Sequence, residues 1–175
     1  MSISDLRKTL GEYAKDIKIN LGNVLSEEGA PGLNEEQIFG TALACIYATK
    51  HEDLIKAALD DASNKLDDAH INAAKAAATI MGMNNIYYRF VHLSEDKEFL
   101  TMPANLRMNV INQSAIEKAD FELYCLAVSA INGCGMCITA HTRELLAAGF
   151  TKQAIQSAIR IAAVINATAQ ALVIN

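Results

Sequence analysis

The chain has 175 residues, a length that fits one domain, with 51% hydrophobic and 20% charged residues. This composition excludes a disordered chain and supplies enough apolar side chains for a buried core. The formal net charge of -5 comes without any basic block, which argues against nucleic acid as the main ligand.

Helices are predicted along the whole chain. Residues from Thr41 to Met81 include neither Gly nor Pro, and strand-like alternation is absent, so the fold class is all-α. The two prolines, Pro31 and Pro103, each fall in a short break, and Gly82 is expected to permit close helix packing. The predicted helices span 4–25, 35–49, 51–62, 67–82, 84–92, 104–112, 119–131, 134–148 and 152–172.

Several helix ends carry recognisable capping residues. Asn34 with Gln37, and Ser114 with Glu117, have the spacing of a capping box. Gly149 is placed to end the helix that precedes it, and the following Thr151 is placed to cap the next helix.

No segment predicts export or membrane insertion. The first twenty residues lack the basic end and apolar run of a signal peptide. The most apolar window, 161–174, is interrupted by polar residues and is too short to span a bilayer. We therefore expect a cytoplasmic protein that does not associate with membranes. In that reducing compartment the four cysteines are expected to be catalytic, metal-binding or buried rather than a disulfide framework.

The chain resembles itself at a shift of 85 residues. This shift lays residues 42–46 over 127–131 and residues 75–80 over 160–165. We therefore predict a single domain over residues 1–175 with an internal two-fold repeat, its halves at about 30–95 and 115–175.

The repeat also serves as an internal control for the most unusual stretch, NGCGMCITAH at 132–141. Under the shift its two cysteines and histidine fall on residues of other types: Thr49, Glu52 and Lys56. Only the second half thus carries the C-x-x-C site, which indicates that the fold itself does not require it.

The two cysteines of this stretch are placed for thiol chemistry. Asn132 and Gly133 end one helix, so Cys134 lies near the first turn of the next, where free N–H groups and the helix dipole favour an anion. Such positions lower a cysteine pKa from about 8.5 to roughly 3.5–7.5. Since the thiolate is the reactive form, Cys134 and Cys137 are candidate redox residues.

A base and a carboxylate accompany the dithiol. His141 lies four residues after Cys137, on the same helix face, and can exchange a proton with it. Glu122, on the preceding helix, can orient His141 if the two helices fold back on each other. Glu122, Cys134, Cys137 and His141 are therefore the predicted catalytic residues.

Two other interpretations of these cysteines remain open. They could be ordinary core residues, or Cys134, Cys137 and His141 could bind zinc with Glu122 as a fourth ligand. Cys45 and Cys125 are interpreted as buried hydrophobic side chains, and the other three histidines as surface or structural residues. Because no phosphate loop or dinucleotide fingerprint is present, we expect no bound cofactor, and electrons would arrive by thiol exchange.

The spacing of a Glu, eleven residues and C-x-x-C-x-x-x-H resembles the alkyl hydroperoxidase D family, within the carboxymuconolactone decarboxylase-like superfamily. Residues 73–90 and 106–111 also fit this resemblance. It implies a compact all-helical fold with an internal repeat and a homotrimeric assembly. It further implies an antioxidant peroxidase that reduces organic hydroperoxides, regenerates a partner peroxiredoxin, and takes electrons from dihydrolipoyl groups on a lipoylated carrier protein.

The resemblance also implies individual roles. Cys137 would attack the peroxide, Cys134, as the more exposed sulfur, would resolve the sulfenic acid and exchange with partners, and His141 with Glu122 would relay protons. Some relatives have a histidine just before the second cysteine, where this chain has Met136, so no relay through that position exists here. A lyase of the carboxymuconolactone type, which has no need of a C-x-x-C pair, and a redox- or zinc-responsive binding protein are the alternatives.

Overall fold

The computed structural model describes residues 2–175 and confirms the all-α prediction, since that range holds helices and no strand. Its α-helices are α1 (Ile3–Thr9), α2 (Lys15–Val24), α3 (Glu35–Thr49), α4 (Glu52–Ala62), α5 (Asp68–Leu93), α6 (Lys118–Asn132), α7 (Gly135–Ala147) and α8 (Lys152–Val173). The described residues also include three short 3₁₀ helices: η1 (Glu12–Ala14), η2 (Lys97–Leu100) and η3 (Asn109–Asn112).

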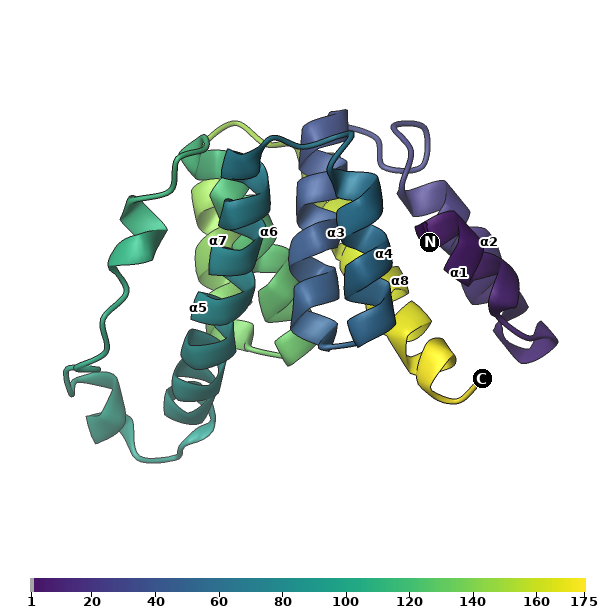
Figure 1. Ribbon diagram of the computed structural model, residues 1–175. Coiled ribbons are helices and arrows are strands. Elements are labelled where there is room, and N and C mark those ends of the chain that lie inside the picture. The colour runs from purple at the N-terminus through teal and green to yellow at the C-terminus, as the bar shows by residue number, and fades with distance from the viewer. Residues whose placement is uncertain (1) are drawn as a thin grey trace.

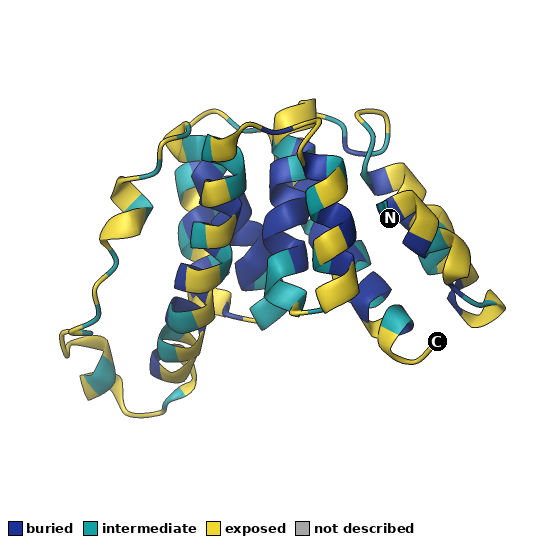
Figure 2. Ribbon diagram, in the orientation of Figure 1, coloured by how far each residue is buried: buried dark blue, intermediate teal, exposed yellow. Residues whose placement is uncertain are grey.

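Helices α3 and α6 form the centre of the molecule. They pack against each other, and each also packs against both long helices, α5 and α8. Helix α4 covers α3, α7 covers α6 and α5, and the α1–α2 pair lies at one side against α4 and α8 (Figure 1). The buried residues accordingly concentrate on the central helices, while the segment after α5 is largely exposed (Figure 2).

Helix α6 is buried on all sides along most of its length. Every residue from Phe121 to Ser129 is buried, the pattern of a helix enclosed by others. Its close approach to α3 depends on Gly40, because a Cβ there would overlap the ring of Tyr124. Glu122 is the one acidic residue in this buried run, so the fold must supply it with a partner.

Helices α3, α4 and α5 follow one another as α6, α7 and α8 do. The helix ends show which residues of the two halves correspond. The left-handed C-caps of α3 and α6, Lys50 and Gly133, lie 83 residues apart, as do the N-caps of α4 and α7, His51 and Cys134. The helix ends therefore favour an offset two residues shorter than the predicted 85, because alanine-rich helices match one another at several shifts whereas caps do not. Duplication as the origin of this arrangement stays a prediction.

Three of the predicted helix boundaries are wrong. The predicted helix 4–25 is broken after Thr9, where Leu10 is extended and a 3₁₀ turn precedes α2. The two helices predicted at 67–82 and 84–92 are one continuous α5. Gly82 does not interrupt it, and no other group lies within 4 Å of a Cβ placed there, so this glycine does not serve the close packing that was expected.

The third error concerns the segment between α5 and α6. Residues 104–112, predicted as a helix, are mostly irregular and end in the short η3. Glu117 is the N-cap of α6 without a side-chain cap, and Ser114 instead accepts a hydrogen bond from the N–H of Ile116. By contrast, the Asn34 capping box is confirmed, as is the Thr151 cap of α8.

The segment 94–117 runs away from the end of α5 and returns beside the same helix to the start of α6 (Figure 1). Its η2 and η3 turns contact α5. Within the described residues, no helix is both long and apolar enough to cross a membrane.

Candidate active site

The turn between α6 and α7 positions both cysteines of the C-x-x-C stretch. Gly133 ends α6 with a left-handed conformation, φ +70°, which favours glycine. Cys134 is the N-cap of α7, and its Sγ accepts the backbone N–H of Cys137 at 3.3 Å. The predicted location of the dithiol at a helix N-terminus is therefore confirmed.

Cys134 and Cys137 form a disulfide, with their Cα atoms 5.3 Å apart. Cys134 is completely buried, whereas Cys137 retains 7% of its surface. The expectation that Cys134 is the more exposed sulfur is thus wrong for this oxidised form. The physical reason is its place at the cap, where the side chain folds back over the first turn of α7.

His141 and Glu122 meet directly in the interior. His141 Nδ1 lies 2.6 Å from Glu122 Oε2, and both residues are buried. When Glu122 is ionised it can only accept a hydrogen bond, and His141 Nδ1 is then the donor in this contact. The neutral ring then carries its lone pair on Nε2, the nitrogen that can accept a proton. The contact that sequence spacing left undecided between α6 and α7 is therefore present.

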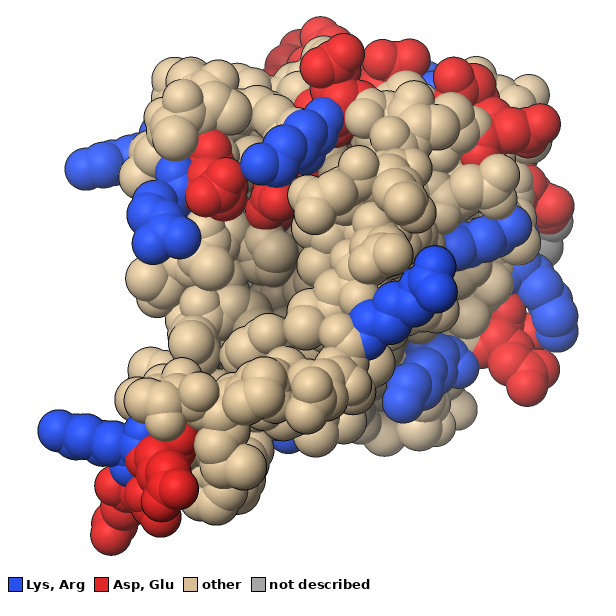
Figure 3. All heavy atoms as spheres, turned by 90° about the vertical axis from the view of Figure 1, so that its left-hand side faces the viewer, with Lys and Arg blue, Asp and Glu red and all other residues tan. Residues whose placement is uncertain are grey.

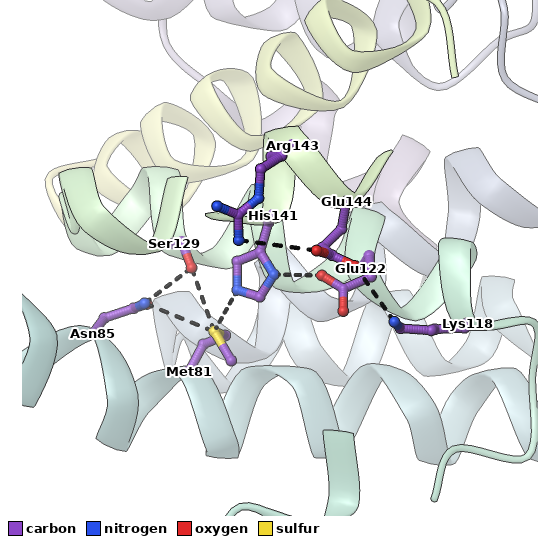
Figure 4. A network of polar contacts seen from close by, with 8 residues as sticks. All are labelled: Met81, Asn85, Lys118, Glu122, Ser129, His141, Arg143 and Glu144. Atoms are coloured by element: carbon purple, nitrogen blue, oxygen red, sulfur yellow. Dashed lines mark hydrogen bonds and ion pairs between the residues drawn. The ribbon is translucent and has the colours of Figure 1, made fainter. Parts of the chain in front are cut away.

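A methionine sulfur occupies the other side of the imidazole. His141 Nε2 lies 3.3 Å from Met81 Sδ, and this sulfur accepts hydrogen bonds from the Ser129 hydroxyl and the Asn85 amide (Figure 4). Helices α5, α6 and α7 thus converge on one thioether. Within the described residues, His141 makes no hydrogen bond to Cys137, whose sulfur is bonded to Cys134.

A small apolar cavity of about 240 Å³ brings Cys137 and His141 to a common space. Helix α5 and the 94–117 segment form the facing walls. The lining residues are Met81, Asn84, Tyr88, Met108, Ile111, Met136, Cys137, Ala140 and His141. The side of the molecule that the 94–117 segment crosses is hollowed and bordered mainly by uncharged side chains (Figure 3).

The remaining cysteines lie away from this cavity. Cys45 and Cys125 are free and fully buried. Burial raises the pKa of the Cys45 thiol well above its usual range. Burial first, and the nearby Glu122 second, raise the pKa of Cys125. Both are therefore held as unreactive thiols.

A metal site is not assembled from the candidate ligands. Across residues 2–175, no group of three or more His, Cys, Asp or Glu side chains is placed to hold a metal ion. Glu122 and His141 instead bind each other, and the two sulfurs share a bond.

Two neighbours of the site, Met81 and Asn84, were not predicted as functional residues. They lie three positions apart on α5, on the face turned toward α7. The available signal was a pair of asparagines, 84 and 85, inside an otherwise apolar helical stretch, since buried polar residues need partners.

A family profile described as the carboxymuconolactone decarboxylase family matches residues 97–174, which include α6, α7 and α8. Whole-chain relatives are more informative. A protein of Coxiella burnetii (strain Dugway 5J108-111) named alkyl hydroperoxide reductase AhpD is 56% identical over 166 residues, covering 95% of this chain and 94% of the relative. A protein of the same name from Brucella suis (strain ATCC 23445 / NCTC 10510) is 51% identical over 172 residues, covering 98% and 97%.

Proposed function

This chain belongs to the AhpD family, within the carboxymuconolactone decarboxylase family, and we propose on that premise that it is an antioxidant enzyme that reduces organic hydroperoxides. The observation that carries the proposal is the Cys134–Cys137 pair at the start of α7, with His141 and Cys137 lining one apolar cavity. The relatives' printed name, alkyl hydroperoxide reductase, supports the same reaction class.

In the reduced enzyme, Cys137 is proposed to attack the terminal oxygen of R–O–O–H as a thiolate. The O–O bond breaks, an S–O bond forms, and the sulfur loses two electrons to give a sulfenic acid. The leaving RO⁻ takes a proton and departs as an alcohol. His141 is proposed to accept the Cys137 proton and return it to RO⁻, with Glu122 holding the ring through Nδ1.

Cys134 is proposed to complete the cycle. Its thiol attacks the sulfenic acid of Cys137, releasing water and forming the disulfide. Two successive thiol exchanges with a dihydrolipoyl group on a carrier protein then restore both thiols and leave the lipoyl group oxidised. The same dithiol is proposed to reduce the disulfide of a partner peroxiredoxin by exchange.

Exchange with another protein requires a local opening at Cys134. A fully buried sulfur cannot meet a partner's sulfur, so the turn at Gly133–Gly135 must move before Cys134 reacts with a carrier. Cys137, which lines the cavity, is the sulfur that a small thiol reaches first.

A homotrimer, implied by the family resemblance, is proposed as the assembly. Large apolar side chains are exposed along the end of α5 and in the segment beyond it: Ile86, Phe90, Leu93, Leu100 and Met102. Contacts between copies would remove this surface from water. Native mass spectrometry of the wild type and of Phe90→Glu tests the assembly; a monomeric wild type would contradict it.

Mass spectrometry of the thiols tests the proposed chemistry. Treating the reduced enzyme with tert-butyl hydroperoxide should remove two hydrogens from the Cys134–Cys137 peptide while Cys45 and Cys125 stay free. Dihydrolipoamide should then restore both thiols, and adding a lipoylated carrier with a peroxiredoxin should give continuous turnover. Thiols that persist after peroxide, or zinc in stoichiometric amount, would favour the redox- or zinc-responsive binding protein instead.

A further inference from the structure

The side-chain oxygen of Asn84 is buried without a hydrogen-bond partner at the Cys137 cavity. The residue is 4% exposed, and its Oδ1 is shielded from solvent without a hydrogen bond. Four other buried side-chain atoms in residues 2–175 share this condition, but they belong to Arg7, Thr41, Tyr47 and Tyr124, which do not line this cavity. An unpaired buried amide oxygen is costly, so its presence beside a reactive cysteine points to a ligand.

The next residue shows what a structural asparagine looks like in this helix. Asn85 donates to Ser129 at 2.9 Å and accepts from Asn132 at 3.0 Å. Its amide is therefore used on both sides to tie α5 to α6. Asn84 instead lines the cavity together with Met81 and Tyr88, at helical spacing on α5, and its Oδ1 makes no such tie.

The chemistry of the cavity suits one kind of ligand. Apart from Asn84 and the reacting pair, the walls are mainly thioether, aliphatic and aromatic groups, which come from Met81, Tyr88, Met108, Ile111, Met136 and Ala140. Its volume of about 240 Å³ is below the 300–1,000 Å³ usual for ligand pockets. The space therefore fits a compact apolar group that carries a small polar end.

Building on the proposed function, we infer that Asn84 binds the peroxide group of the substrate and that the cavity selects compact apolar alkyl hydroperoxides. A hydroperoxide offers one O–H donor and two oxygen acceptors, and an amide offers a matching acceptor and donor. The Asn84 Oδ1 accepts the terminal O–H, and its N–H₂ donates to the oxygen that bears the alkyl group. As the O–O bond breaks, that oxygen gains negative charge, so the donated bond strengthens in the transition state.

The binding pose also orders the reacting groups. When the alkyl group lies against the methionines, the terminal oxygen faces Cys137. The Cys137 sulfur can then attack this oxygen in line with the O–O bond. The departing oxygen stays between Asn84 and His141, the group proposed to return the proton. Water can occupy the same place in the resting enzyme and is displaced by the peroxide oxygens.

The test compares Asn84→Leu with Asn85→Leu in the full chain. Asn84→Leu, which replaces an unpaired amide by an apolar group of similar size, should unfold at the same temperature as the wild type or higher. Asn85→Leu should unfold at a lower temperature, because it removes paired hydrogen bonds.

Kinetic measurements separate substrate binding from structure. Asn84→Leu should slow the single-turnover oxidation of Cys137 by tert-butyl hydroperoxide by roughly 10- to 100-fold. It should leave the alkylation of Cys137 by iodoacetamide and the reduction of the disulfide by dihydrolipoamide within about two-fold, since neither involves an O–O bond. The wild type should prefer tert-butyl hydroperoxide to a long-chain fatty acid hydroperoxide.

The outcomes are distinct for the two proposals. Equal peroxide rates in wild type and Asn84→Leu would overturn the role of Asn84 and leave the proposed function intact. An equal slowing of the peroxide reaction, the alkylation and the disulfide reduction would do the same. A preference for the long-chain peroxide would overturn the selectivity. A wild type that does not react with any hydroperoxide would overturn the proposed function and this inference with it.

Discussion

The turns that begin α4 and α7 have the same backbone construction and different chemistry. In the first, Lys50 adopts a left-handed conformation and His51 caps α4, its Nδ1 accepting the N–H of Leu54 at 3.3 Å. In the second, Gly133 is left-handed and Cys134 caps α7, its sulfur accepting the N–H of Cys137 at the same distance. The cap geometry is therefore scaffold, and the side chains placed on it decide the chemistry.

The residues around the two caps sharpen this contrast. At the offset given by the helix ends, Cys137 corresponds to Leu54 and His141 to Ala58, both buried in the core. Glu122 corresponds to Phe39, which packs against the core. The second half thus has a buried acid, a base and a thiol where the first half has apolar packing. This difference costs core packing and gives a site that the first half lacks.

The largest expected effect comes from removing the attacking sulfur. Cys137→Ser should lower peroxide turnover by about 1,000-fold or more, because a hydroxyl is a far weaker nucleophile than a thiolate. A peroxidase assay with dihydrolipoamide as reductant measures this. If Cys137→Ser turns over peroxide at the wild-type rate, Cys137 is not the attacking residue, and the functional difference between the two halves does not depend on it.

Neutralising the buried carboxylate should have the next largest effect. Glu122→Gln keeps the shape of the side chain but allows the amide to donate to His141, so the ring can present the wrong tautomer. We expect kcat to fall by roughly 10- to 100-fold, with little change in KM. The matched change in the first half, Phe39→Leu, should leave kcat unchanged, and an equal loss in both variants would indicate a stability effect.

The buried cysteine of the first half predicts a dependence of stability on pH. The raised pKa of Cys45 means that the folded chain keeps this proton at pH values where the unfolded chain releases it. The associated stability is present below about pH 8.5 and is lost as pH rises, by up to about 1.4 kcal/mol per pH unit. Urea denaturation between pH 7 and 10 should show a steeper decline for wild type than for Cys45→Ala; parallel curves would contradict the prediction.

The smallest effect is expected at the cap of the first half. His51→Ala removes the acceptor for the N–H of Leu54 and should lower the free energy of unfolding by about 0.5–1 kcal/mol. Peroxide turnover should be unchanged. A clear loss of turnover at constant stability would show that the first half contributes to the chemistry after all.

Much of the fold was predictable because local signals agree with it. The helix from Glu35 to Thr49 begins at a capping box and was placed with its observed bounds. The Asn132–Gly133 break likewise placed Cys134 at a helix start. The errors arose where context overrides local preference: Gly82 remains helical inside α5, and residues after Pro103 form an irregular segment rather than a helix.

The site was predictable in composition but not in assembly. The four candidate residues follow from their spacing along two helices, yet whether Glu122 reaches His141 depends on how α6 and α7 cross. Met81, 60 residues from His141, and Asn84 enter the site only because α5 packs against α7. Burial of Cys134 was missed for the same reason, since sequence shows a helix start but not what covers it.

The short loop closed by the Cys134–Cys137 bond has a consequence for the stability of the protein in its two redox states. The bridge joins residues only three apart, so closing it restricts the unfolded chain by about 2 kcal/mol. The oxidised chain should therefore melt several degrees above the reduced chain and resist proteolysis better. Because a stability difference of this size can change the abundance of a protein in a cell several-fold, the amount of this protein would rise with the fraction that is held oxidised.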